Sequence, residues 1–141
     1  MKDRRHLLTM LWIFATLNYI YCDVFTLMDP AFLSKLLTGT VGSIQFTPEF
    51  LLAMSALMQV PMAMVLLSHI LPPGANRWAN ILAGTFLTLV QAGTLMSGTP
   101  TSYYVFFSAF EIPCTLAIVG LAWTWRATAS ATLPARQPAH G

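Results

Sequence analysis

The chain has 141 residues, of which 56% are hydrophobic and 9% are charged, and its formal net charge is +2. Soluble domains carry about 25% charged residues, so this composition excludes an ordinary soluble globular protein. The basic residues form no run beyond residues 2–6, which argues against nucleic acid as a partner. The two cysteines are too few for a disulfide scaffold and lack a zinc-type spacing. We therefore expect no metal and no cofactor.

Four apolar segments predict helices that cross a membrane, at residues 7–27, 50–71, 78–96 and 103–125. Each has about the 20 residues that a helix needs to span a bilayer core, and none shows the alternation of barrel strands. No cleavage site with small residues follows the first segment, so we expect this helix to be retained. The predicted fold is an all-α, four-helix transmembrane domain over residues 1–126, followed by a disordered cytoplasmic tail at 127–141.

The positions of the basic residues predict the orientation of these helices. If the N-terminus is cytoplasmic, the outer loops hold only Lys35. The cytoplasmic pieces then hold Lys2, Arg4, Arg5, Arg77, Arg126 and Arg136. This strong positive-inside bias predicts that both termini are cytoplasmic in a multi-pass protein of the inner or plasma membrane. Aromatic belts are expected at Trp78, Trp123 and Trp125 on the inner side and at Tyr103 and Tyr104 on the outer side.

Capping residues predict where several helices begin. Asp29-Pro30 indicates a short helix in the first outer loop, which ends at Gly39 and lies on the membrane surface. Thr47-Pro48 and Thr99-Pro100 are expected to start the second and fourth long helices. Asn76 is expected to cap the third.

Polar side chains share one face on most of these helices, as a membrane bundle requires to hide them from lipid. The stripes on the first, third and fourth helices are Thr9, Trp12, Thr16, Tyr19, Asp23 and Thr26; Asn80, Gly84, Thr88, Gln91, Thr94 and Gly98; and Tyr104, Ser108, Glu111, Thr115, Ala122 and Arg126. The second helix is less regular, and we expect Ser55, Gln59 and His69 to face inward. Asp23 and Glu111 fall in the outer half, which predicts a polar chamber that opens outward and closes toward the cytoplasm.

Glu111 is the leading candidate for a functional residue. An isolated carboxylate near the middle of a membrane costs at least about 2.5 kcal/mol on insertion scales, so we expect Glu111 to be protonated or hydrogen-bonded. The structural alternative is a neutral acid that bonds Gln59 or Asn18 across the core. Asp23 is the second candidate, and its structural alternative is hydration at the interface.

The remaining candidates for ligand binding are polar residues within the predicted spans: Asn18, Tyr19, Gln59, Gln91 and Ser108. Such groups also join helices through hydrogen bonds, which remains an alternative for each of them. Pro61 and Pro113 each leave one helical carbonyl without its N–H donor. The resulting opening is either a plain kink of the helix or part of the wall of a cavity. Met54, Met58 and Met62 form a strip that suits an adaptable apolar pocket or ordinary packing.

Residues 17–23, LNYIYCD, and residues 27–30, LMDP, carry a resemblance to known proteins. They resemble the N-terminal part of a family of small four-helix bacterial membrane proteins that is known only as a domain of unknown function. The resemblance covers nearly the whole chain and implies the fold, but no activity and no site residues. The placement of acidic residues near the outer face is similar to that in membrane sterol isomerases and small membrane terpene cyclases. This similarity concerns the layout alone and no shared motif.

Three functions remain open on the sequence. The first is a protein that binds a small molecule or couples to protons, such as a transporter subunit or a sensor. The second is an intramembrane acid–base enzyme, an isomerase or cyclase with a lipid-like or isoprenoid substrate, in which Glu111 and Asp23 are the catalytic acids. The third is an accessory subunit of a membrane complex that contacts its partner through Gly84-x-x-x-Thr88. The expected partners are the bilayer, a small apolar or amphipathic ligand, and a second copy or another membrane subunit.

Overall fold

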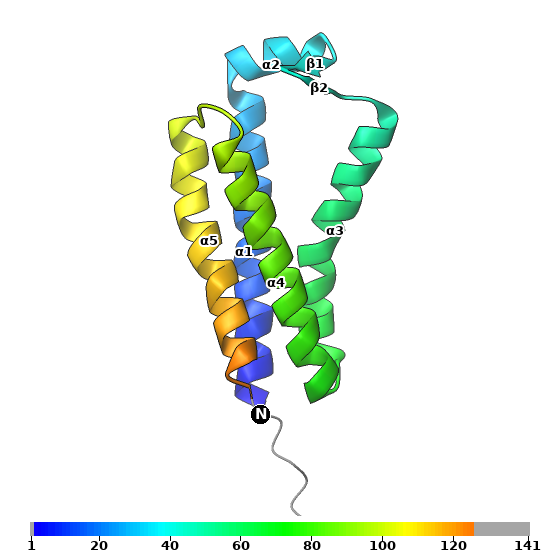
Figure 1. Cartoon of the computed structure of the whole chain (residues 1–141), viewed down its shortest axis with the longest axis vertical. Coiled ribbons are helices and arrows are strands. Elements are labelled where there is room, and N and C mark those ends of the chain that lie inside the picture. Colours follow the sequence, from blue (N-terminus) through cyan, green and yellow to red (C-terminus); the bar gives the residue numbers. More distant parts are fainter. Residues whose placement is uncertain (1, 126–141) are drawn as a thin grey trace, which may run out of the picture.

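Four long helices dominate the computed structural model, which describes residues 2–125; the predicted tail at 127–141 lies outside these residues. They are α1 (Lys2–Met28), α3 (Pro48–Ile70), α4 (Pro73–Met96) and α5 (Ser102–Trp123), and they run side by side (Figure 1). All four are long and apolar enough to cross a membrane. The predicted all-α class is therefore confirmed, and the chain is a multi-pass membrane protein.

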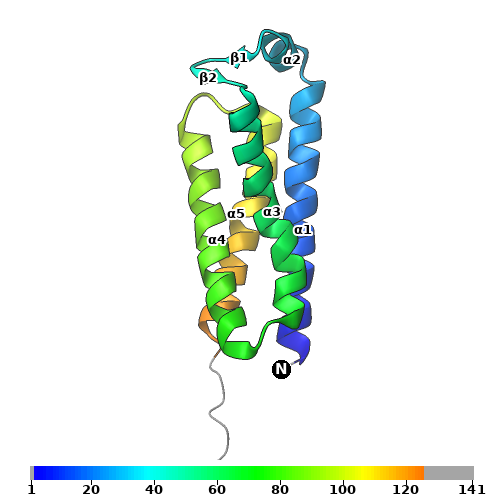
Figure 2. The same cartoon turned by 90° about the vertical axis from the view of Figure 1, so that its right-hand side faces the viewer.

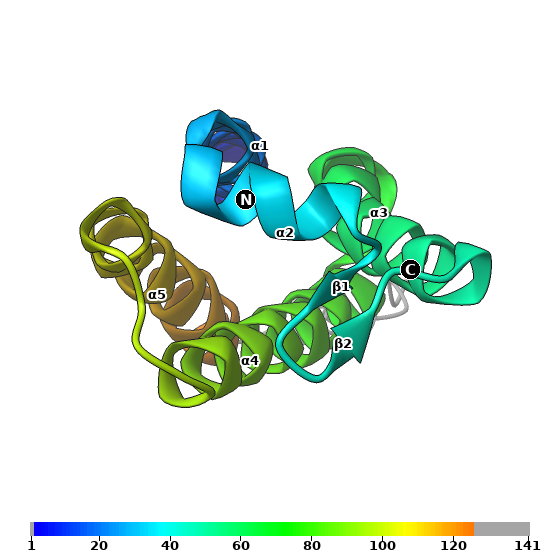
Figure 3. The ribbon, with the colours of Figure 1, turned by 90° about the horizontal axis from the view of Figure 1, so that it is seen from above.

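A short helix and a hairpin cover one end of the bundle. α2 (Pro30–Leu37), β1 (Thr40–Val41) and β2 (Ile44–Gln45) run across this end from α1 toward α3 and α4 (Figures 2 and 3). We call it the α2 end and the opposite one the N-terminal end. Asp29 caps α2 as expected, since its Oδ1 accepts a hydrogen bond from the N–H of Ala31 at 2.9 Å. The sequence did not predict the antiparallel hairpin, which follows Gly39 with its positive φ of 77°.

Two of the predicted helix starts are wrong. α4 begins at Pro73, which needs no N–H donor in the first turn, so Asn76 lies inside the helix instead of capping it. α5 begins at Ser102 after Thr101, two residues beyond Pro100. The third prediction is confirmed, because the Oγ1 of Thr47 accepts from the N–H of Phe50 at 3.2 Å at the start of α3.

The long helices form a ring in which α1 contacts α3 and α5, and α4 contacts α5 and α3 (Figure 3). α4 and α5 share the most extensive contact, whereas α3 and α4 share the least. Figure 1 shows the reason, since α3 leans away from α4 toward the α2 end. Pro61 lies inside α3 and leaves the carbonyl of Leu57 without its helical donor. The bundle is therefore tight along α4 and α5 and loose between α3 and α4.

The close approach of α4 to α5 depends on Gly84. A Cβ at this position would lie 2.8 Å from Cγ2 of Val119 and 3.3 Å from the carbonyl oxygen of Thr115. One turn along, the Oγ1 of Thr88 donates to the Oγ1 of Thr115 at 2.7 Å. The Gly84-x-x-x-Thr88 surface thus packs against α5, and the expectation that it contacts a separate partner is wrong.

Gly84→Ala is expected to lower the free energy of unfolding by about 1–3 kcal/mol, because the stiff, β-branched Val119 must move or α4 must separate from α5. Gly93→Ala is the matched control on the same helix, since a Cβ there meets no atom within 4 Å. That change should be neutral or stabilising by up to about 1 kcal/mol. Reversible unfolding in mixed micelles measures both, and equal stability of the two variants would contradict the close contact.

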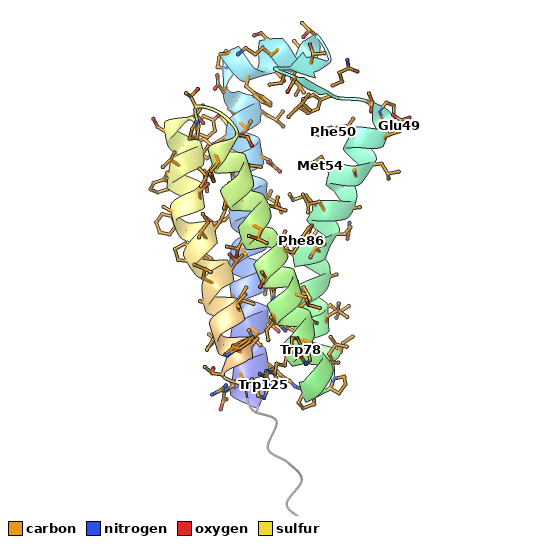
Figure 4. All side chains as sticks on the ribbon, in the orientation of Figure 1. Glu49, Phe50, Met54, Trp78, Phe86 and Trp125 are labelled. Carbon is orange, nitrogen blue, oxygen red and sulfur yellow. The ribbon has the colours of Figure 1, made fainter. Side chains whose placement is uncertain are left out.

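Hydrophobic side chains fill the half of the bundle nearer to the N-terminal end. The buried core consists of Leu8, Trp12, Ala15, Tyr19, Met64, Leu87, Cys114, Ile118 and Trp125. Trp125 is only 4% exposed, so its expected place in an aromatic belt is wrong; Trp78, by contrast, lies on the surface of the same end (Figure 4). The large side chains of this core occupy the space between the helices, and only Tyr19 among them also reaches the cavity described below.

A polar cluster, which we call the Asn80 network, joins three helices inside this core. Asn80 Oδ1 accepts from Nε1 of Trp12 at 2.7 Å and from Oγ of Ser68 at 3.1 Å. Its Nδ2 donates to the carbonyl oxygen of Asn76 at 2.8 Å and to Oδ1 of Asn76 at 2.6 Å. Asn76 Nδ2 in turn donates to the carbonyl oxygen of Ser68 at 2.6 Å. All four side chains are fully buried, so the network ties α1, α3 and α4 together where α3 and α4 still touch.

Candidate functional site

A cavity of about 260 Å³ lies in the other half of the bundle, nearer to the α2 end, and all four long helices contribute to its wall. Its apolar side consists of Met54, Leu57 and Met58 from α3 and Val90 from α4. Its polar side consists of Tyr19, Cys22, Asp23, Gln91, Thr94, Tyr104 and Glu111. The polar residues come from α1, α4 and α5, the three helices with clean stripes in the sequence.

Glu111 is the most unusual group in this wall. Its side chain is 0% exposed, and neither carboxyl oxygen has a hydrogen-bond partner within the described residues. The expectation that Glu111 bonds Gln59 or Asn18 is therefore wrong. Leaving a buried polar group unpaired costs about 1–3 kcal/mol, and more when the group is charged. The wall of the cavity thus includes a carboxyl group with two buried acceptor atoms that no donor among the described residues satisfies.

Two residues of α1 face the cavity beside Glu111. Tyr19 is 8% exposed, and its hydroxyl also lacks a partner. Asp23, one turn further along α1, is exposed on one side and lines the cavity on the other. The two acids therefore occupy different environments in one site, and none of the lining residues is Lys, Arg or His. The lining supplies no positive charge.

Hydrogen bonds between α4 and α5 hold the opposite wall in place. Gln91 Nε2 donates to Oγ of Ser108 at 2.7 Å, and Ser108 Oγ donates to the carbonyl oxygen of Tyr104 at 2.8 Å. The hydroxyls of Thr94 and Tyr104 are 2.6 Å apart. Ser108 does not line the cavity itself but orients Gln91, which does. These bonds make the α4–α5 wall rigid around Glu111.

Besides Ser108, two more of the residues expected at the site lie outside the cavity wall. Asn18 bonds its own helix, with Nδ2 donating to the carbonyl oxygen of Phe14 at 2.9 Å. Gln59 is exposed, so the prediction that it faces the interior is wrong, as it is for Ser55 and His69. α3 instead buries its face with Pro61, Met64 and Ser68. The face of α3 that packs against α1 is mostly apolar. The few polar residues of α3 therefore did not indicate which face of this helix is turned toward the interior.

Sequence reasoning left several cavity residues unassigned, although some carried a signal. Thr94 and Tyr104 belonged to the polar stripes. Tyr104 lies two helical turns before Glu111, on the same face of α5. Met54 and Met58 line the cavity, so this part of the methionine strip is a pocket wall, whereas Met62 is exposed. Cys22 lines the cavity beside Asp23 and carries a free thiol.

Metal ligation finds no support within residues 2–125, where no three His, Cys, Asp or Glu side chains group closely enough to hold an ion. His6 and His69 line a separate depression of about 440 Å³ at the N-terminal end, together with Asp3 and Arg5. This depression lies at the opposite end of the bundle from Glu111.

The fold and the site together define a small multi-pass membrane protein with an unpaired, buried acid in a cavity between its helices. Over residues 1–132 the chain matches a family described as a family of unknown function, DUF6326, and it belongs to that family. The match confirms the resemblance to a domain of unknown function. No curated protein and no solved structure matches the chain.

Proposed function

We propose that the protein binds a small molecule in this cavity and that binding is coupled to the release of a proton from Glu111. One observation carries the proposal: Glu111 belongs to the cavity wall, its side chain is completely buried, and neither of its carboxyl oxygens has a hydrogen-bond partner within the described residues. Buried polar groups in native proteins are nearly always hydrogen-bonded, and each exception needs a physical explanation, of which a binding or catalytic role is one. A bound ligand would supply the missing donors.

The charges around Glu111 define what this ligand would be. The titratable groups that line the cavity with it are Tyr19, Cys22 and Asp23 on α1 and Tyr104 on α5, while α3 and α4 contribute none. An isolated carboxylate in such a site costs several kcal/mol, so Glu111 holds a proton while the site is empty. A ligand with a positive charge or strong hydrogen-bond donors replaces that proton, and the nearby Asp23 favours a cation further.

The proposed location is the plasma membrane of a bacterium, with the α2 end outside. The support for this orientation is the positive-inside rule, since Arg4, Arg5 and Arg77 lie at the N-terminal end and Lys35 lies in α2. The cavity would then lie in the outer half of the membrane, as suits a transporter subunit or a sensor.

Labelling with dicyclohexylcarbodiimide, an apolar reagent that attacks protonated carboxyl groups, tests the proposal in membranes. We expect Glu111 to be labelled at acidic pH and progressively less as the pH rises. Butylamine, a small cationic probe, should protect Glu111 because its ammonium group displaces the proton and fills the site. Mass spectrometry of the peptide measures both effects, with the N-acylurea and the butylamide, which forms when the amine displaces dicyclohexylurea, both counted as reacted Glu111.

Glu49 provides a matched control, since this exposed glutamate at the start of α3 lies outside the cavity. Butylamine should not protect Glu49 from a water-soluble carbodiimide; there it acts only as a nucleophile that displaces the urea from the activated carboxyl group and forms the butylamide. Failure of Glu111 to react at any pH, or reaction that butylamine does not reduce, would contradict the proposal.

A second candidate is an intramembrane acid–base enzyme with a lipid-like or isoprenoid substrate. The observation that favours it is that Glu111 and Asp23 line one cavity in different environments, as a proton donor and a stabilising carboxylate require. Binding remains the conclusion because no hydrogen bond orients the carboxyl group of Glu111, and catalytic acids need such positioning.

A further inference from the structure

An apolar groove runs between α3 and α4 and measures about 510 Å³. Every side chain that lines it is hydrophobic, and the part that lies outside the cavity wall consists of Ala53, Ala56, Val60 and Phe86. Figure 4 shows Met54 on α3 and Phe86 on α4 at opposite sides of the gap that opens where α3 leans away. The groove lies along membrane-spanning helices, so its open side faces the bilayer.

The groove and the cavity adjoin one another. Met54, Leu57 and Val90 line both of them. The cavity alone, at about 260 Å³, is smaller than the roughly 300–1,000 Å³ of typical small-molecule sites. It therefore has room for a head group, and a larger ligand must extend past Met54 into the groove.

We propose that the cavity and the groove form a single site for a single-chain amphiphile with an amine head, which enters from the bilayer between α3 and α4. The inference rests on the proposed function and specifies its ligand. The ammonium group pairs with Glu111 and Asp23, and the hydrocarbon chain lies against Ala56 and Phe86. Carboxylate and phosphate heads do not fit, because the lining has no cation to compensate their burial.

A photoreactive dodecylamine with a diazirine at its terminal carbon tests this assignment in phospholipid vesicles. We expect cross-links on the groove residues of α3 and α4, and competition by butylamine, which takes only the head site. Glu111→Gln should reduce this labelling roughly tenfold or more, the usual effect of losing a charge-assisted hydrogen bond. The matching probe with a carboxylate head should label the groove weakly.

Ala56→Phe fills the groove and should reduce cross-linking several-fold, whereas Ala117→Phe, an exposed position of α5 outside the groove, should not. Labelling spread evenly over the outer faces of all helices, or equal labelling by the carboxylate probe, would overturn the inference. Efficient disulfide cross-linking of two Ala56→Cys chains without amine labelling would assign the groove to a second copy. In each of these cases protection of Glu111 by butylamine would still stand, so the two proposals fail separately.

Discussion

Asn80→Leu is expected to lower the free energy of unfolding by about 2–4 kcal/mol. The substitution removes the acceptor of the Trp12 indole N–H and the donor to Oδ1 of Asn76, and both groups are fully buried. Each orphaned group costs about 1–3 kcal/mol, although membrane proteins recover part of this because the unfolded chain finds other partners. The loss should exceed that of Gly84→Ala because three helices lose a shared connection.

Asn18→Leu is the matched control for this prediction. The Asn18 amide bonds only a carbonyl of its own helix, and its removal should change the stability by less than about 0.5 kcal/mol. Titration with sodium dodecyl sulfate in mixed micelles, followed by circular dichroism, compares the two variants. A double-mutant cycle with Trp12→Phe should give a clear coupling energy to Asn80→Leu. Additive effects of these two changes would show that the indole does not bond Asn80.

The sequence was sufficient for the parts of the fold that depend on length, composition and helical period. The four spans follow from apolar segments long enough to cross a bilayer, and the structure has a helix at each of them. The inward position of Glu111 follows from its stripe, because Ser108 and Thr115 on the same face are buried with it. A membrane helix that carries several polar residues on one face turns that face toward the other helices. The rotation of such a helix in the bundle therefore follows from its sequence.

The features that the sequence could not supply depend on contacts between helices. The few polar residues of α3 do not mark the face that it buries, so its pattern did not show that Met64 is buried and Gln59 exposed. Ser68 joins the Asn80 network from the same helix, but a single serine has no period. The groove between α3 and α4 is a consequence of how far α3 leans away from α4. The alanines that line it follow no pattern that would distinguish them from other alanines in membrane helices.

Removing the carboxyl group of Glu111 is expected to make the protein more stable and less able to bind. Glu111→Leu replaces a buried carboxyl without a partner by a hydrocarbon of similar size, and should raise the free energy of unfolding by about 1–3 kcal/mol. Glu111→Gln should weaken butylamine binding by about 10–100-fold, because a hydrogen bond to a charged group contributes about 1.5–3 kcal/mol. Isothermal calorimetry and micelle unfolding measure the two effects.

The pH dependence separates a binding role of Glu111 from a structural one. Wild-type affinity for butylamine should rise with pH while the amine stays charged, because the ligand must displace a proton that leaves more easily at higher pH. Glu111→Gln has no such proton and should show much less dependence, with Asp23 as the remaining acid in the lining. Asp23→Asn should keep most of the pH dependence, since the fully buried acid is the one that must lose its proton. If Glu111→Leu instead destabilised the fold and Glu111→Gln kept the wild-type pH profile, the acid would be structural, and the cavity would have no reason to hold a charge.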